Sequence, residues 1–208
     1  LGGYGVQVTS VCCDVTSEMG RDTLLQACQK PDILVNTAGG PPPGLWSDWE
    51  SEDFINAVNA NMITPISLIK AVLPYMISQE WGRIVNITSQ AVKAPVPALG
   101  LSNSARAGLT GYVAGTSRQV AEYGVTINNL LPGMHDTRRL VDLDSALSKE
   151  KGISLEEART MRMSSIPVGR YGTIEEFGNA CAFICSQYSG FIIGQNILLD
   201  GGAVNSTF

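Results

Sequence analysis

The chain has 208 residues, of which 44% are hydrophobic and 16% are charged, a composition typical of one globular domain and not of a disordered or fibrous protein. Its net charge is −5, and its 14 basic residues are scattered along the sequence, which argues against a nucleic-acid-binding surface because such a surface needs clustered positive charge. One hydrophobic core, with no DNA or RNA partner, is therefore expected.

Apolar runs rich in β-branched residues alternate with segments of helical periodicity, a pattern typical of a parallel sheet with crossover helices. Strands are predicted near residues 6–13, 32–36, 82–89, 125–131 and 196–199. Helices are predicted near residues 17–29, 51–79, 102–123, 154–164 and 173–186. The predicted fold class is α/β, a doubly wound parallel sheet in a single domain that covers residues 1–208.

The most apolar helical stretch, residues 58–77, is interrupted by polar and proline residues, so a buried core helix is expected there and not a membrane span. The five cysteines include no Cys-x-x-Cys pair and lie in apolar stretches, which favours reduced thiols in a cytoplasmic protein. Cys181 and Cys185 share a helix face, but no second pair of ligands accompanies them. They are expected to pack, and no metal site is predicted.

In a parallel sheet the carboxyl ends of the strands share one edge, so the loops that follow the predicted strands should carry function. Asp14 could accept a hydrogen bond from an adenine amine, or could cap the helix that begins near Ser17. Small residues at 36–40 would let a flat ligand approach the backbone, although Gly-Gly pairs are often only turns. The Pro-Gly turn at residues 132–137 brings the Thr137 hydroxyl to the same edge.

His135 is the only histidine, and it lies in this turn. It could act as an acid or base near neutral pH, with Asp136 as its one adjacent carboxylate. Residues 134–165 are long, polar and partly helical, which suits a lid over a pocket.

Taken in order, these segments resemble the short-chain dehydrogenase/reductase family, which has a Rossmann-type fold and uses NAD or NADP. The similarity, of the kind found in 3-oxoacyl-acyl-carrier-protein reductases, runs from residue 4 to the Asp-Gly-Gly motif at 200–202. It implies that residues of the strand-end loops bind the cofactor: Asp14, Val15, Asn36, Ala38, Gly39, Pro132, Gly133 and Thr137. Asp14 and Val15 would contact the adenine, and Thr137 the carboxamide or a phosphate.

The same resemblance implies catalytic or supporting roles for four residues. Asn61 occupies the place of the family asparagine that holds a proton-relay water, and Ser89 that of the serine that orients the substrate. The family's Tyr-x-x-x-Lys motif aligns with Ser102 and Arg106, and Arg106 would also hold the cofactor ribose. The family's catalytic tyrosine is therefore missing from this sequence.

This replacement should weaken proton donation, because an aliphatic hydroxyl is far less acidic than a phenol beside a cation. A water would have to bridge the gap that the short Ser102 side chain leaves, and Arg106 cannot shuttle a proton as lysine may. Tyr112 should point away from the site because of its helical position. Alternatively, Ser102 could be a helix N-cap, and Arg106 could bond a carboxylate or pack at a subunit contact.

A further departure from the family lies at the start of the sequence. The family's first strand and its Thr-Gly-x-x-x-Gly-x-Gly loop, which receives the pyrophosphate, have no counterpart here. The sequence opens without methionine in a glycine-rich turn at Leu1. It is therefore expected to begin within the domain of a longer protein.

The leading hypothesis is an NAD(P)-dependent oxidoreductase that acts on a carbonyl or alcohol, such as a 3-oxoacyl compound, with a water or His135 as the acid. One alternative is a non-catalytic homologue that binds a dinucleotide or another small molecule. Another is a lyase similar to halohydrin dehalogenases, which have arginine for lysine but keep the tyrosine. A homodimer or homotetramer is expected, because the family pairs its long helices, which here carry apolar residues: Leu68, Ile69, Val72, Leu109, Val113 and Val120.

Overall fold

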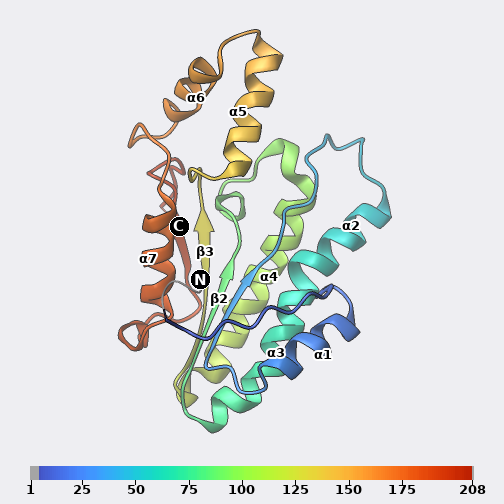
Figure 1. Cartoon of the computed structure of the whole chain (residues 1–208), viewed down its shortest axis with the longest axis vertical. Coiled ribbons are helices and arrows are strands. Elements are labelled where there is room, and N and C mark those ends of the chain that lie inside the picture. The colour runs from blue at the N-terminus through green and yellow to red at the C-terminus, as the bar shows by residue number, and fades with distance from the viewer. Residues whose placement is uncertain (1–4, 208) are drawn as a thin grey trace.

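A computed structural model describes residues 5–207 of the chain, so most of the expected turn at residues 1–5 lies outside the described residues. The fold alternates strands and helices along most of its length (Figure 1). A π-helix at Asn59–Ile63 joins two of the helices. The main elements are α1 (Glu18–Ala27), β1 (Ile33–Thr37), α2 (Ser51–Val58), α3 (Thr64–Ser78), β2 (Gly82–Ile87), α4 (Gly100–Val120), β3 (Val125–Pro132), α5 (Arg138–Lys151), α6 (Leu155–Met163), α7 (Ile174–Ile184) and β4 (Asn196–Leu199).

The described strands form one parallel sheet in the order β1-β2-β3-β4. Helices α3 and α4 cover one face of the sheet, and α7 covers the other (Figure 1). Parallel pairing with helices on both faces confirms the predicted α/β fold class. All strands therefore end at the same edge, which is where the sequence predicted the functional loops.

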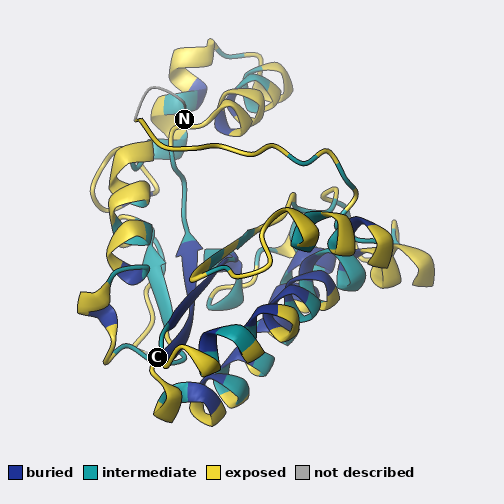
Figure 2. Cartoon of the chain, turned by 60° about the horizontal axis from the view of Figure 1, so that its bottom comes forward, coloured by how far each residue is buried: buried dark blue, intermediate teal, exposed yellow. Residues whose placement is uncertain are grey.

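Two apolar clusters hold the layers together. On one face, β-branched and other aliphatic residues of β2 and β3 pack against α3 and α4, with Ile69, Met76 and Val113 fully buried. On the other face, Val85 and Leu130 pack against Ile184 of α7. Figure 2 shows that the central strands are buried while the outer faces of the helices are exposed. Burial of these side chains is the main force that holds the helices on the sheet.

The strand predicted at residues 6–13 is wrong, because these residues form neither a strand nor a helix. Val6 and Val8 are 59% and 47% exposed, so the segment buries little apolar surface. A strand needs a neighbour that accepts its backbone hydrogen bonds, and β1, which forms one border of the described sheet, pairs only with β2 among the described residues. High β-propensity alone does not supply that neighbour.

The long helix predicted at residues 51–79 is divided into α2, the π-helix and α3. Its Ser51–Ser78 span is the only one in the described residues long and apolar enough to cross a membrane, judged by length and composition alone. Its inner side chains pack against the sheet, and these include Ile69, Val72 and Met76. This packing is that of a core helix in a folded domain.

The apolar residues expected to form a subunit contact do not lie on the surface. Each of them is buried within the chain, with 0% to 6% of its surface exposed: Leu68, Ile69, Val72, Leu109, Val113 and Val120. The prediction that these side chains face a second subunit is therefore wrong. Tyr112 also packs against this core.

A ladder of asparagine side chains crosses the whole described sheet. The amide of Asn36 donates to Asn86, Asn86 donates to Asn129, and Asn129 donates to Asn196, over distances of 2.8 to 3.0 Å. The four residues are direct partners in the strand registers, so each amide lies beside the next. A shift of one residue in any strand would turn its asparagine to the other face and break the ladder.

Asn86→Ala is expected to lower the free energy of unfolding by about 2 kcal/mol, because it leaves the buried Oδ1 of Asn129 without its donor. Equilibrium unfolding in urea measures this loss. Asn56→Ala serves as the control, since Asn56 is exposed on α2 and should change stability by less than about 0.5 kcal/mol. Equal losses in the two variants would show that the ladder does not stabilise the sheet.

Candidate functional site

Two adjoining cavities lie at the carboxyl ends of the strands. The smaller has a volume of about 300 Å³ and the larger about 820 Å³. They share wall residues at the ends of β1 and β2, namely Thr37, Ala38 and Ile87, and they share Arg106 of α4. The carboxyl edge of the sheet, predicted to be functional, is therefore hollowed around Arg106.

Arg106 is a buried cation held by uncharged groups. Its side chain donates to Ser102 Oγ at 3.1 Å, to the Ile87 carbonyl at 3.0 Å and to the Ala38 carbonyl at 3.3 Å. Burial, and then the positive charge of Arg139, lower the pKa of Arg106 below its usual range. The residue bonds no carboxylate in the described part of the chain, so its charge is available to a ligand in either cavity.

Ser102 and Ser89 both line the larger cavity. Ser102 is not a helix N-cap, because α4 begins at Gly100 and Leu99 occupies the cap position. The Ser102 hydroxyl accepts from Arg106, one helical turn away. Ser89 follows β2 and caps a short 3-10 helix, where its hydroxyl accepts from the Ala91 amide at 3.1 Å. Both hydroxyl hydrogens remain free to point at a ligand.

Asn61 lies on the π-helix between α2 and α3 and lines the smaller cavity. Its amide nitrogen donates to the Ala57 carbonyl at 3.4 Å, while its Oδ1 is buried without a hydrogen-bond partner. A π-turn within a helix is often found at functional sites because it redirects side chains. The unsatisfied oxygen can accept a hydrogen bond from a donor such as a water or a ligand hydroxyl.

The predicted cofactor residues divide between the cavities. The smaller cavity is lined by residues of β1 and of the loops before and after it: Val15, Asn36, Ala38 and Gly39. Ala38 lines the larger cavity as well. The larger is lined by the turn after β3: Pro132, Gly133 and Thr137. Position 133 has no room for a side chain, because an added Cβ would come within 2.7 Å of the Asp200 Cα atom. Apart from Asp14, every predicted site residue therefore lines one of the two cavities.

Asp14 lines neither cavity. Its carboxylate accepts from the Thr16 hydroxyl at 2.7 Å and from the Thr16 amide at 2.9 Å, and these bonds lower the pKa of Asp14. The Asp14 carbonyl accepts from Ser17, the N-cap of α1. This arrangement favours the alternative that Asp14 organises the start of the helix.

His135 lines the larger cavity, but Asp136 does not orient it. The Asp136 carboxylate instead forms an ion pair with Arg159 at 2.6 Å. Nδ1 of His135 lies 3.4 Å from the Gly133 carbonyl, and the ring packs edge-on against Phe177. None of the described residues that line either cavity is a tyrosine.

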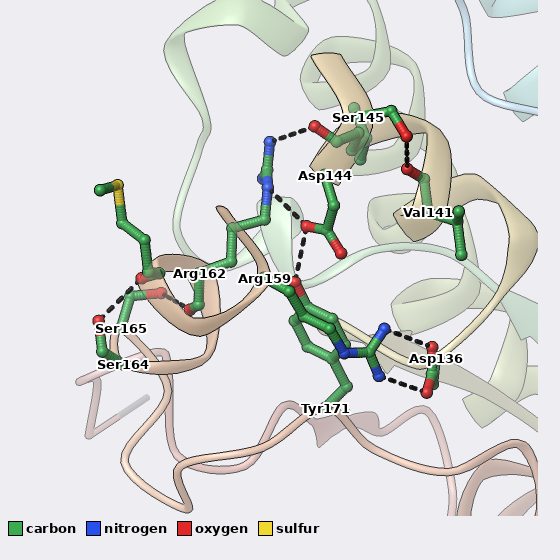
Figure 3. A network of polar contacts seen from close by, with 11 residues as sticks. Asp136, Val141, Asp144, Ser145, Arg159, Arg162, Ser164, Ser165 and Tyr171 are labelled. Carbon is green, nitrogen blue, oxygen red and sulfur yellow. Dashed lines mark hydrogen bonds and ion pairs between the residues drawn. The ribbon is translucent and has the colours of Figure 1, made fainter. Parts of the chain in front are cut away.

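Helices α5 and α6 both contribute residues to the wall of the larger cavity. A polar network joins the two helices (Figure 3). Asp144 of α5 is 1% exposed and lies 3.1 Å from Arg162 of α6. It also accepts from the Tyr171 hydroxyl at 2.8 Å, and Arg159 stacks over the Tyr171 ring. Burial, followed by the bond to Asp144, raises the pKa of Tyr171 to about 12. The expected lid segment is therefore a pair of packed helices.

The sequence did not identify Arg139, which lines the larger cavity from the first turn of α5. No helix was predicted at residues 138–151, although the longer segment was expected to be partly helical. A signal was present in the Arg138-Arg139 pair directly after Thr137. Cations are disfavoured at a helix N-terminus, so two in succession indicate a special role or a solvated surface.

The family is identified by its match to known proteins. A family model described as enoyl-(acyl carrier protein) reductase matches residues 2–204. The 3-oxoacyl-[acyl-carrier-protein] reductase FabG of Vibrio harveyi is 31% identical over 205 residues, which are 97% of this chain and 79% of that protein. This chain belongs to the short-chain dehydrogenase/reductase family. Its resemblance to 3-oxoacyl-acyl-carrier-protein reductases is thereby confirmed.

Other relatives agree with this family membership. The NADPH-dependent reductase BacG of Bacillus subtilis is 30% identical over 179 residues, which are 86% of this chain and 69% of that protein. Among solved structures, YwfH, an NADPH dependent reductase involved in bacilysin biosynthesis, matches with a TM-score of 0.91 and 27% identity. The match covers 99% of this chain and 81% of that one. The short-chain dehydrogenase/reductase fold therefore extends over nearly the whole sequence.

Proposed function

We propose that this family member is an NAD(P)-dependent oxidoreductase that acts on a carbonyl or alcohol, with 3-oxoacyl-like compounds among its substrates. The observation that carries the proposal is Arg106, a buried cation at the junction of two cavities. It bonds Ser102 and two loop carbonyls and faces both cavities. This placement suits a residue that holds a cofactor beside a substrate.

The residues present fit the ribose and nicotinamide groups of a dinucleotide, whereas the loop that receives the pyrophosphate in the family has no counterpart in this sequence. Asn61 Oδ1 in the smaller cavity and Gln90 Oε1 in the larger are buried acceptors without partners, and ribose or amide groups could satisfy them. Ala38 and Gly39 add little bulk beside Arg106. A bound nicotinamide would supply or accept the hydride. NADPH is favoured over NADH because BacG and YwfH are both described as NADPH-dependent.

The chain's own residues can position the substrate. The Ser89 hydroxyl is free to donate to the reacting oxygen, and the positive charge of Arg106 favours negative charge that develops nearby. We infer that a water bonded to Ser102 donates the proton, because no phenol lines the cavity among the described residues. His135 is a second candidate donor on the same wall. Turnover should be low in either case.

A non-catalytic role is the second candidate, and the observation that favours it is that no tyrosine is among the described residues lining the cavities. In that case the cavities would bind a dinucleotide or another small molecule without reaction. We expect a homodimer or homotetramer in the cytoplasm in both cases, by analogy with the family. Light scattering on the purified protein measures the assembly state.

The chain is expected to bind NADPH, and Arg106→Ala should weaken that binding at least about tenfold because it removes a buried cation from the junction of the cavities. Fluorescence titration with NADPH and NADH measures both affinities. Arg118→Ala is the control, since Arg118 lies exposed on the same helix and lines neither cavity. If neither nucleotide binds the unaltered chain, the proposed cofactor is wrong.

A further inference from the structure

The larger cavity contains a second cation, Arg139, at its wall. Arg139 lies in the first turn of α5, and its side chain has no hydrogen-bond or ion-pair partner among the described residues. Its guanidinium lies against Gly40 in the loop after β1, where an added Cβ would be 3.2 Å from Arg139 Nη1. The side chain therefore reaches from α5 toward the opposite loop, and its charge stays unpaired.

The charge of this cavity is opposite to that of the whole chain. Three arginines line it, Arg106, Arg139 and Arg162, and none of the described lining residues is Asp or Glu. Asp144 neutralises Arg162, but no carboxylate pairs with the other two. The chain as a whole carries a net charge of −5. A concave site lined by one sign of charge concentrates ligands of the other sign.

The start of α5 adds to this positive field. Thr137, the N-cap residue, lines the cavity but makes no side-chain hydrogen bond to the helix, and the first turn contains no acidic residue. Arg138 and Arg139 instead lie where the helix dipole disfavours cations. Uncapped backbone N–H groups beside an unpaired guanidinium form a set of donors suited to an anion.

We propose that the substrate carries a carboxylate or phosphate group, which binds Arg139 at the start of α5. The reacting carbonyl then lies deeper in the cavity, beside Ser89 and Ser102. This inference rests on the proposed function for the reaction, but the anion site itself depends only on the groups around Arg139. A planar guanidinium binds either kind of anion through paired N–H donors.

Binding to pairs of small carbonyl compounds tests the substrate class. Acetoacetate, levulinate and dihydroxyacetone phosphate are titrated into the 208-residue chain by calorimetry, with and without NADPH. Their uncharged counterparts are methyl acetoacetate, methyl levulinate and dihydroxyacetone. In at least one pair the anion should bind about tenfold more tightly or better, because it gains charge-assisted hydrogen bonds.

Arg139→Ala should remove this preference and leave the affinity for NADPH unchanged. Arg138→Ala is the matched control, since it deletes the same charge one residue earlier and Arg138 does not line the cavity. The control variant should keep the preference. A preference that survives Arg139→Ala, or is lost equally in both variants, overturns the assignment.

Two further outcomes separate this proposal from binding of a cofactor phosphate at Arg139 and from failure of the proposed function. If Arg139→Ala weakens NADPH binding and no anion is preferred, the guanidinium binds a cofactor phosphate and the substrate proposal is wrong. If the chain binds no dinucleotide but still prefers the anion through Arg139, the anion site stands and the proposed cofactor is wrong. Absence of preference in every pair overturns the proposal directly.

Discussion

Replacing Ser102 by tyrosine and Arg106 by lysine is expected to raise the rate of NADPH-dependent carbonyl reduction by a factor of about 10² to 10⁴. The gain comes from a positioned acid, which typically contributes this much to a rate. A phenol beside a lysine ammonium is a far stronger acid than the Ser102 hydroxyl. Initial rates with a panel of ketones and oxo esters, measured by NADPH absorbance, give kcat/KM for each variant.

The site has room for this change. Ser102 lines a cavity of about 820 Å³, so a tyrosine ring can extend from the start of α4 toward Ser89. The lysine would lose some of the bonds that Arg106 makes to the Ile87 and Ala38 carbonyls, and some stability with them. Circular dichroism and NADPH titration therefore accompany the rate measurements, to show that the variant folds and binds.

Ser102→Phe together with Arg106→Lys is the matched control, because it adds the ring without the hydroxyl. It should show no gain in rate. A gain in this control would assign the effect to packing instead of proton donation. If the unaltered chain already turns over as fast as the tyrosine variant, then a water or His135 serves as an effective acid, and the inferred weakness in proton donation is wrong.

The sequence predicted the fold well where strands are buried on both faces. The predicted strands near β2 and β3 are buried along nearly their whole length, as expected for central parallel strands, and both form. The segment at residues 6–13 has a similar composition but forms no strand, because strand pairing depends on distant neighbours. The local sequence pattern shows which segments could form a strand. Whether a segment does so depends on a neighbouring strand with which it can pair.

The candidate site was predictable to the extent that it follows strand ends. Asn36, Ser89 and Gly133 lie after or at the end of strands, so the shared edge of a parallel sheet brings them together. Arg139 was missed because its place depends on where α5 begins and how it packs. The pairing of Asp136 with Arg159 likewise joins residues far apart in sequence, and it occupies the one carboxylate that is adjacent to His135 in the sequence.

Asp144→Ala is expected to lower the free energy that holds α5 on α6 by about 3 kcal/mol. Asp144 is 1% exposed, and its loss leaves Arg162 without its ion pair and the Tyr171 hydroxyl without its acceptor. The expected loss of free energy is near the lower end of the range for breaking a buried ion pair, because the Arg162 side chain is 25% exposed. Hydrogen exchange of the α5 and α6 amides measures this local stability, and urea unfolding measures the global value.

Asp142→Ala provides the control for this variant, since Asp142 is an exposed carboxylate on the same helix and should change exchange little. Because α5 carries Arg139 and part of the cavity wall, Asp144→Ala should also weaken ligand binding, whereas Asp142→Ala should not.

The raised pKa of Tyr171, about 12, should make the stability of the fold depend on pH in alkaline solution. An unfolded tyrosine titrates near 10, so the contribution of Tyr171 is complete below about pH 10 and is lost as pH rises toward 12. Tyr171→Phe should remove that loss, and an unchanged alkaline profile would show that the bond from Tyr171 to Asp144 does not stabilise the fold.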